Sequence, residues 1–198
     1  MVNFNQVGTY NGKFLSPNSA LPICGVVLFD MYKNNLQQVY NNVTTQPLTW
    51  GMPVTIKTQQ TTNPNNAGKA FNPNVLVLAN ISTADNDLNG FVVKSVTDIL
   101  MPQDEAPASR HSQISYVATF GSGVELYLPC DTTLMNVETS AISKNNTFDY
   151  NFKSYELTAG TAFSITLKSN VVDGVVTYYD TNSQSVKIKS TKCVKVRL

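Results

Sequence analysis

The stretch Phe163-Ser-Ile165-Thr-Leu167-Lys168 alternates apolar and polar residues. Successive side chains of a β-strand point to opposite faces of its sheet, so this period of two predicts a strand with the three apolar residues on its inner face. The same alternation recurs at residues 54–57 and 124–128. The pattern appears for the last time near the C-terminus, where the apolar residues are all even-numbered and would share one face of a strand: Val186, Ile188, Val194, Val196 and Leu198. Segments of this kind predict an all-β protein.

Further segments bring the expected total to about eight to ten short strands. Residues 75–79 and 91–93 are almost continuously apolar, which is typical of strands buried on both faces. Residues 114–120 and 174–179 add two more. Helix is expected to be scarce, and its best candidate is a two-turn segment over Met31–Val39. We therefore predict a sandwich or small barrel.

Polar segments rich in Asn and Pro interrupt the strands and predict long loops at residues 58–74 and 101–113. We expect residues 1–45 to form an N-terminal arm with the first strands, and residues 46–198 to form the main β domain. An internal boundary near 101–113 is the alternative division. A chain of 198 residues is long enough to bury a substantial core.

Glycine-containing turns separate the predicted strands. Asn-Gly and Asp-Gly supply the positive φ angles that tight hairpin turns require. The segment Val171-Val-Asp173-Gly174-Val-Val176 is the strongest predicted hairpin. The other turn candidates are Asn11-Gly12, Asn89-Gly90, Gly121-Ser-Gly123 and Ala159-Gly160.

Charged residues are scarce, at 14% of the chain, with 14 Lys and Arg against 13 Asp and Glu. An ordinary soluble domain carries roughly a quarter. Because there is no basic excess, we do not expect a nucleic-acid partner. The first residues have no apolar stretch of the secretory type, and no apolar run approaches the length of a membrane span, so a membrane partner is not expected either.

The motif Asp85-Asn-Asp87-Leu-Asn89-Gly90 matches the opening of an EF-hand calcium loop. Two features argue against calcium: Val96 stands where the twelfth residue of such a loop is a glutamate, and residues 91–93 resemble a strand rather than a helix. A turn that leads Gly90 into a strand explains every residue of the motif. We favour the turn and retain the calcium site as the alternative.

No catalytic constellation can be assembled from the sequence. The single histidine, His111, stands in a proline-containing loop with Asp104 and Glu105, away from any predicted nucleophile. The cysteines are far apart, contain no Cys-x-x-Cys pair and are expected to be buried free thiols: Cys24, Cys130 and Cys193. The expectation is a protein that is not an enzyme, with no catalytic residue, metal or cofactor.

The bases are concentrated at the C-terminus, where no acid follows Asp180. We call these residues the basic stripe: Lys187, Lys189, Lys192, Lys195 and Arg197. One interpretation is a solvated edge strand whose charges prevent pairing with other chains. The alternative is a docking stripe for a protein partner, and a nucleic-acid contact is a third, weaker interpretation. We include Lys187, Lys189, Lys195 and Arg197 among the candidate interface residues.

Aromatic residues supply the other interface candidates. Trp50 closes a polar stretch and opens a strand, so it is either half-buried there or an interface anchor. Phe4, Tyr10 and Phe14 lie in the N-terminal arm without clean periodicity. Such an arm packs on its own sheet or along a neighbouring subunit.

In their order along the chain, several motifs resemble those of the cement, or decoration, proteins on bacteriophage capsids. The resemblance covers about residues 50–145. Its elements are Gly51-x-Pro53-Val54, Val75-Leu-Val-Leu-Ala79, Asn89-Gly-Phe-Val-Val93, Gly121-x-Gly-Val-Glu-Leu126 and Met135-Asn-Val-Glu-Thr-Ser-Ala-Ile142.

This resemblance implies a structural virion protein, made in the host cytoplasm, that binds the outside of an icosahedral capsid and stabilises it by bridging major capsid subunits. Its partners would be the major capsid protein and neighbouring copies of the chain, in a dimer or trimer. The alternative function is a carbohydrate-binding or adhesin-type β domain of a phage fibre, based on Trp50 and Tyr178-Tyr179. A hydrolase with a dispersed site around His111 is the least supported hypothesis.

Overall fold

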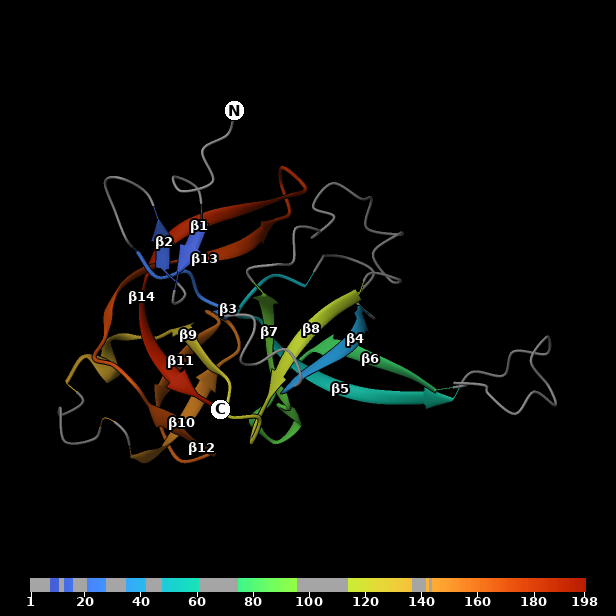
Figure 1. Cartoon of the computed structure of the whole chain (residues 1–198), viewed down its shortest axis with the longest axis horizontal. Helices are drawn as coiled ribbons and strands as arrows, with labels where there is room; N and C mark the ends of the chain where they lie inside the picture. The colour runs from blue at the N-terminus through green and yellow to red at the C-terminus, as the bar shows by residue number, and fades with distance from the viewer. Residues whose placement is uncertain are drawn as a thin grey trace.

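Figure 1 shows a computed structural model of the chain, which describes residues 8–10, 13–15, 21–27, 35–41, 48–60, 75–95, 114–136, 142 and 144–198. The prediction of an all-β protein is confirmed. The strands are β1 (Gly8–Tyr10), β2 (Lys13–Leu15), β3 (Val26–Val27), β4 (Leu36–Asn41), β5 (Pro53–Gln60), β6 (Val75–Ile81), β7 (Gly90–Ser95), β8 (Ile114–Thr119), β9 (Glu125–Pro129), β10 (Asn145–Asn151), β11 (Glu156–Ala159), β12 (Phe163–Leu167), β13 (Val172–Asp180) and β14 (Ser185–Arg197). Two short 3₁₀ turns, Asp85–Asp87 and Thr132–Asn136, lie between them.

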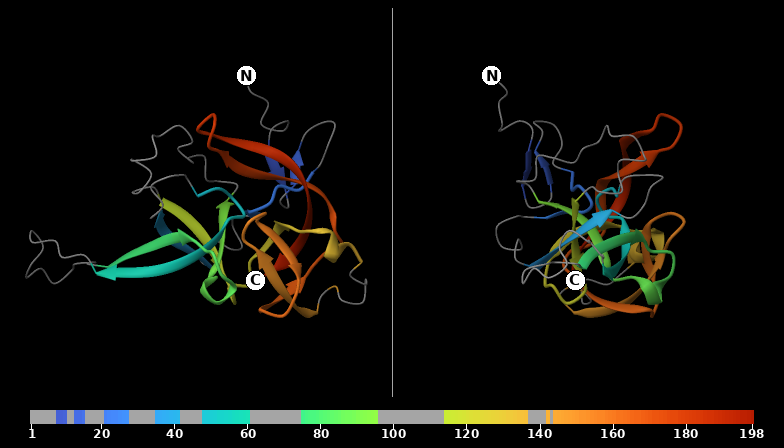
Figure 2. Two further views of the ribbon diagram at one scale, coloured as in Figure 1. Left: turned by 180° about the vertical axis from the view of Figure 1, so that it is seen from behind. Right: turned by 90° about the vertical axis from the view of Figure 1, so that its right-hand side faces the viewer.

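The strands form two larger, mainly antiparallel sheets and the small β1–β2 pair. The first sheet has the order β3-β7-β5-β6-β4-β8, and β7 also pairs with β8. The second has the order β11-β10-β12-β14-β13, with β9 pairing β14 as well. In Figures 1 and 2 the β5–β6 and β13–β14 hairpins extend outward from the two packed sheets.

A shared apolar core joins the two sheets. Phe91 from β7 is fully buried, and its ring packs 5.4 Å, centroid to centroid, from Tyr150 of β10. The alternation predicted for β12 is confirmed, because Ile165 and Leu167 are buried while Ser164 is exposed. On β7, Phe91 and Val93 face this core, and the buried Val92 belongs to a second cluster within the first sheet.

The first 45 residues contribute to the same sheet as the middle of the chain. β3 pairs β7, and β4 pairs both β6 and β8. A division at 45/46 therefore does not coincide with a division between the sheets. The helix predicted over Met31–Val39 is wrong for residues 36–39, which belong to β4, because pairing with two distant strands outweighs a weak local helix signal. Residues 31–34 and 101–113 lie outside the described residues.

The hairpin predicted at Asp173-Gly174 is also wrong. Both residues lie inside β13, where Gly174 is opposite Thr191, and the connection to β14 is made by residues 181–184. Glycine is needed at 174 for close packing, because an added Cβ would collide with Sγ of Cys193 and lie 2.9 Å from the Pro22 carbonyl oxygen. The turn predicted at Gly121-Ser-Gly123 is confirmed, with φ angles of 79° and 73° at its glycines.

The interpretation of the C-terminal segment as an edge strand is wrong for its last part. Residues 193–197 of β14 pair with β9, and Val196 and Arg197 pair with β12 on the other side. Val194, Val196 and Leu198 are buried as their parity predicts. Ile188, which shares that parity, is 63% exposed because it lies on the part of the β13–β14 hairpin that projects beyond the core.

All three cysteines are buried free thiols, as expected. Burial raises the pKa of Cys24, with a hydrogen bond to Cys193 adding to the effect, and burial raises the pKa of Cys130 to about 12. Because all three thiols are buried out of reach of the reagent, we expect none of them to react with Ellman's reagent in the folded protein at pH 8, and all three to react in denaturant. Rapid labelling of the folded protein would contradict this packing.

Candidate functional site

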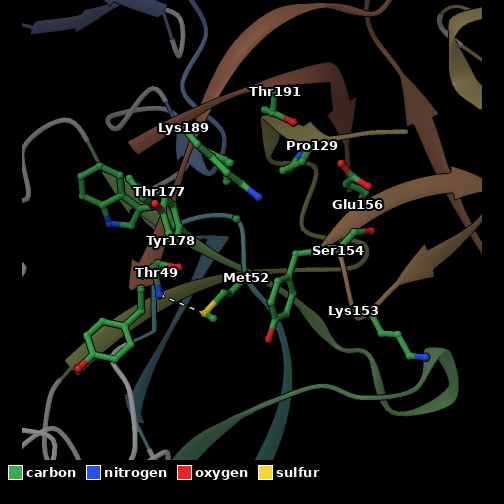
Figure 3. A pocket seen from close by; sticks show the side chains of 15 residues that line it. Thr49, Met52, Pro129, Lys153, Ser154, Glu156, Thr177, Tyr178, Lys189 and Thr191 are labelled. Carbon is green, nitrogen blue, oxygen red and sulfur yellow. Dashed lines mark hydrogen bonds between the residues drawn. The ribbon is translucent and has the colours of Figure 1, made fainter. Parts of the chain in front are cut away.

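A pocket of about 300 Å³ lies between the two sheets, against the β13–β14 hairpin (Figure 3). Three walls form most of it: the segment before β5, the turn between β10 and β11 with the first residue of β11, and the facing strands of the hairpin. Pro129 of β9 completes the lining. The lining residues are Thr49, Trp50, Gly51, Met52, Pro129, Lys153, Ser154, Tyr155, Glu156, Val176, Thr177, Tyr178, Tyr179, Lys189 and Thr191.

The first wall is the Thr49–Met52 turn, which places Trp50 at the pocket. The turn is closed by a hydrogen bond from the Met52 amide to the Thr49 carbonyl at 3.2 Å, and the Thr49 amide contacts Sδ of Met52 at 3.3 Å. Gly51, at φ 84°, donates its amide to the Val92 carbonyl at 2.7 Å. Gly25 packs so closely against Trp50 and Gly51 that it leaves no space for a side chain.

The second wall is the β10–β11 turn, which is held by Asn151. Its side-chain oxygen accepts hydrogen bonds from the amides of Lys153 and Ser154, and its carbonyl accepts one from the Tyr155 amide at 2.8 Å. Tyr155 adopts a positive φ of 59°. This geometry puts Ser154, Tyr155 and Glu156 at the pocket.

The third wall is the hairpin. Lys189 of β14 lies with its ammonium group 5.6 Å from the ring centroid of Tyr178 on β13, within the range of a cation–π contact. Figure 3 shows this ammonium group pointing toward the middle of the pocket, whereas Lys153 points away from it. Thr177 is 7% exposed, and neither its hydroxyl oxygen nor that of Ser154 has a hydrogen-bond partner in the part of the chain that the structure describes.

The structure places the predicted interface residues in different surroundings. Trp50 and Lys189 line the pocket together. Lys187 pairs with Asp180, near the end of the hairpin. Phe4 lies outside the described residues, and Tyr10 and Phe14 lie in the β1–β2 pair, where only their backbone is described. The pocket residues that sequence reasoning missed are Ser154, Tyr155, Glu156 and Thr177, which no sequence motif indicates.

Lys195 and Arg197 form ion pairs within the second sheet. Glu125 of β9 accepts hydrogen bonds from Arg197 Nη2 at 2.6 Å and pairs with Lys195 Nζ at 3.1 Å. Lys168 lies 3.9 Å from the same carboxylate. Burial by itself would raise the pKa of Glu125, but the hydrogen bonds from Lys195 and Arg197 outweigh it and hold that pKa below its ordinary value.

Replacing Glu125 with glutamine is therefore expected to lower the free energy of unfolding by about 1–2 kcal/mol at pH 7. A carboxylate with a depressed folded-state pKa stabilises the fold above its unfolded pKa and loses that contribution as the pH falls through the folded value. The difference between wild type and Glu125→Gln should thus shrink below about pH 4. Urea unfolding at pH 7 and pH 3 measures it, and an equal difference at both pH values would contradict the ion-pair explanation.

The Asp85–Gly90 motif forms the predicted turn into β7. Asp85 accepts a hydrogen bond from the Tyr150 amide at 3.1 Å, and Asn89 accepts one from the Ile56 amide at 2.7 Å. The side-chain oxygens that a calcium ion would require thus hold strands of both sheets. Among the described residues, no three His, Cys, Asp or Glu side chains are grouped as metal ligands. His111, Asp104 and Glu105 lie outside the described residues.

Comparison with protein-family models finds no match, and comparisons with curated proteins and with solved structures find none either. In the part of the chain that the structure describes, there is no helix with the length and apolar character needed to span a membrane.

Proposed function

We propose that the chain is a structural virion protein that binds the outside of an icosahedral bacteriophage capsid and bridges neighbouring major capsid subunits. The observation that carries this proposal is the β13–β14 hairpin, which projects from the packed sheets (Figure 2). Its β14 strand carries Ile188, which is largely exposed. A large apolar side chain on a projecting element is suited to fill a recess on a protein partner. The hairpin residues 181–184 are also exposed.

The charges on this hairpin are consistent with a protein partner of low charge. Lys187 forms an ion pair with Asp180, and Lys192 forms one with Asp173 at 2.7 Å. These bases are already paired within the hairpin, so docking does not require an acidic surface opposite them. The turn presents Asn182, Ser183 and Gln184, whose amide and hydroxyl groups form hydrogen bonds across an interface at a smaller desolvation cost than charges do.

The resemblance to capsid cement proteins gives the second line of support. Four of its five stretches fall on strands: residues 51–54 enter β5, 75–79 lie in β6, 89–93 lead into β7, and 121–126 enter β9. They include buried residues of the shared core such as Phe91 and Leu126. The resemblance therefore includes residues that build the framework.

Because a capsid offers many identical sites close together, contacts of modest individual affinity can hold the protein firmly. A protein that touches two subunits, or that associates with copies of itself on adjacent sites, gains affinity from the high effective concentration of the second contact. Its burial energy adds to the contacts between the capsid subunits. The expected outcome is a shell that withstands a higher temperature when the protein is bound.

The proposal is tested by incubating the purified protein with capsids that lack it, followed by sedimentation and thermal denaturation. We expect the protein to sediment with the capsids and to raise their disruption temperature. Ile188→Asp should weaken binding by about 30-fold, the effect of losing a central interface contact, without unfolding the protein.

Met135→Asp is the matched control, because Met135 is also a largely exposed apolar side chain (51%) but belongs to the Thr132–Asn136 turn and not to the hairpin. This variant should bind as the wild type does. Equal binding by Ile188→Asp and wild type would contradict the role of the hairpin, and a wild-type protein that neither binds nor stabilises the capsids would contradict the proposed function.

A further inference from the structure

We infer that the pocket against the β13–β14 hairpin is a binding site for an uncharged saccharide. This inference goes beyond capsid binding, because it assigns a small-molecule class to a cavity that capsid binding does not use. The pocket volume of about 300 Å³ is at the small end of the range for ligand sites and matches one or two sugar rings.

The aromatic lining is the first argument. Trp50, Tyr155, Tyr178 and Tyr179 come from all three walls of the pocket. A pyranose ring presents C–H groups on its faces and hydroxyl groups around its rim, so its faces pack against aromatic rings while its rim requires polar partners. Trp50 and the Tyr178-Tyr179 pair, the basis of the saccharide hypothesis in the sequence, are brought to this pocket although more than 120 residues separate them.

Unpartnered hydroxyl groups are the second and independent argument. Thr177 is buried, and both its Oγ1 and the Oγ of Ser154 lack a hydrogen-bond partner among the described residues. A buried polar group without a protein partner takes its hydrogen bond from whatever fills the space beside it, which in a pocket is water or a ligand that displaces the water. The hydroxyl groups of a sugar both donate and accept, so they satisfy either side chain.

The charge of the pocket selects the class of saccharide. Lys189 directs one positive charge into it, and Glu156 contributes one negative charge to the same lining. Lys153, the third charged residue of the lining, points away from the pocket (Figure 3). Lys189 has no carboxylate within ion-pair distance among the described residues, so its ammonium group is available to a ligand oxygen. One base balanced by one acid favours a neutral sugar over a uronic or sialic acid.

The sole tryptophan of the chain, Trp50, lines this pocket, so tryptophan fluorescence reports binding there alone. The experiment titrates the purified protein with neutral trisaccharides of glucose, galactose, mannose or N-acetylglucosamine, and with trigalacturonate as the acidic probe. We expect at least one neutral sugar to change the fluorescence in a saturable manner, and Lys189→Gln to raise its Kd about tenfold. Failure of every neutral sugar, or tighter binding of trigalacturonate, would overturn the inference.

Two variants separate binding from folding. Lys192→Gln is the matched control, because it makes the same change on the same strand outside the pocket, and it should bind as the wild type does. Thr177→Val removes the unpartnered hydroxyl while keeping the shape of the side chain, so it should weaken sugar binding about tenfold without lowering the melting temperature of the free protein. Because the isolated protein is used, the result is independent of whether it binds capsids.

Discussion

Gly25→Ala is expected to lower the free energy of unfolding by about 2–5 kcal/mol. Gly25 has a φ of 75°, a conformation that costs an L-residue about 1–2 kcal/mol. An added Cβ would also collide with the Gly51 amide nitrogen and lie 2.6 Å from the Trp50 carbonyl carbon. Relief of that overlap requires backbone movement, for which overpacking costs of about 1–3 kcal/mol are typical.

Gly121→Ala isolates the two contributions. Gly121 has a φ of 79°, close to that of Gly25, but a Cβ added there would have no atom within 4 Å. This control should lose only the conformational cost of about 1–2 kcal/mol. Urea unfolding followed by circular dichroism compares the two variants. A Gly25→Ala protein no less stable than Gly121→Ala would contradict the close approach of Gly25 to the Trp50–Gly51 turn.

Phe91→Ala is expected to be as damaging, with a loss of about 3–5 kcal/mol. The side chain is fully buried between the two sheets, and its ring centroid lies 5.4 Å from that of Tyr150 and 6.1 Å from that of Phe120. Truncation would remove both aromatic contacts and leave a cavity at the place where the sheets are joined. The melting temperature and the urea midpoint measure the effect.

Ile188→Ala supplies the comparison for Phe91→Ala. Both substitutions remove a large apolar side chain, but Ile188 is 63% exposed, so its loss should change the free energy of unfolding by no more than about 0.5 kcal/mol. Similar losses at the two positions would contradict the placement of Phe91 in a core shared by both sheets.

The strands were the part of the fold most accessible from the sequence. A period of two is produced by burial of one face, and burial extends along the whole strand, so segments such as residues 163–168 and 194–198 could be predicted without their partners. Pairing partners could not be predicted in this way. Residues 36–39 form a strand because β6 and β8 flank them, a long-range condition that the local helix signal does not contain.

A glycine was the source of one wrong local prediction. The dipeptide Asp173-Gly174 has the composition of a tight turn, but Gly174 lies within β13 because Cys193 packs against it. Glycine serves either where the backbone needs a positive φ or where a neighbouring group packs too closely for a Cβ, and the sequence alone does not show which role a given glycine has. Only the neighbour across the sheet distinguishes the two roles.

The residues of the pocket could be predicted from the sequence only in part. Trp50 and Tyr178-Tyr179 could be singled out as exposed aromatic candidates, but their meeting depends on the packing of one sheet against the other. Thr177 and Ser154 have no distinguishing sequence feature, because a hydroxyl without a partner is defined entirely by its surroundings. The basic stripe was visible in the sequence, whereas its pairing with Glu125, Asp173 and Asp180 was not.

We propose a capsid location, and an electron cryo-microscopy reconstruction of virions that contain the chain tests it most directly. We expect density on the outer surface of the shell into which the two packed sheets fit, with the β13–β14 hairpin in contact with major capsid subunits. A shell without such density, or density for this fold only in the tail or its fibres, would contradict the proposed function.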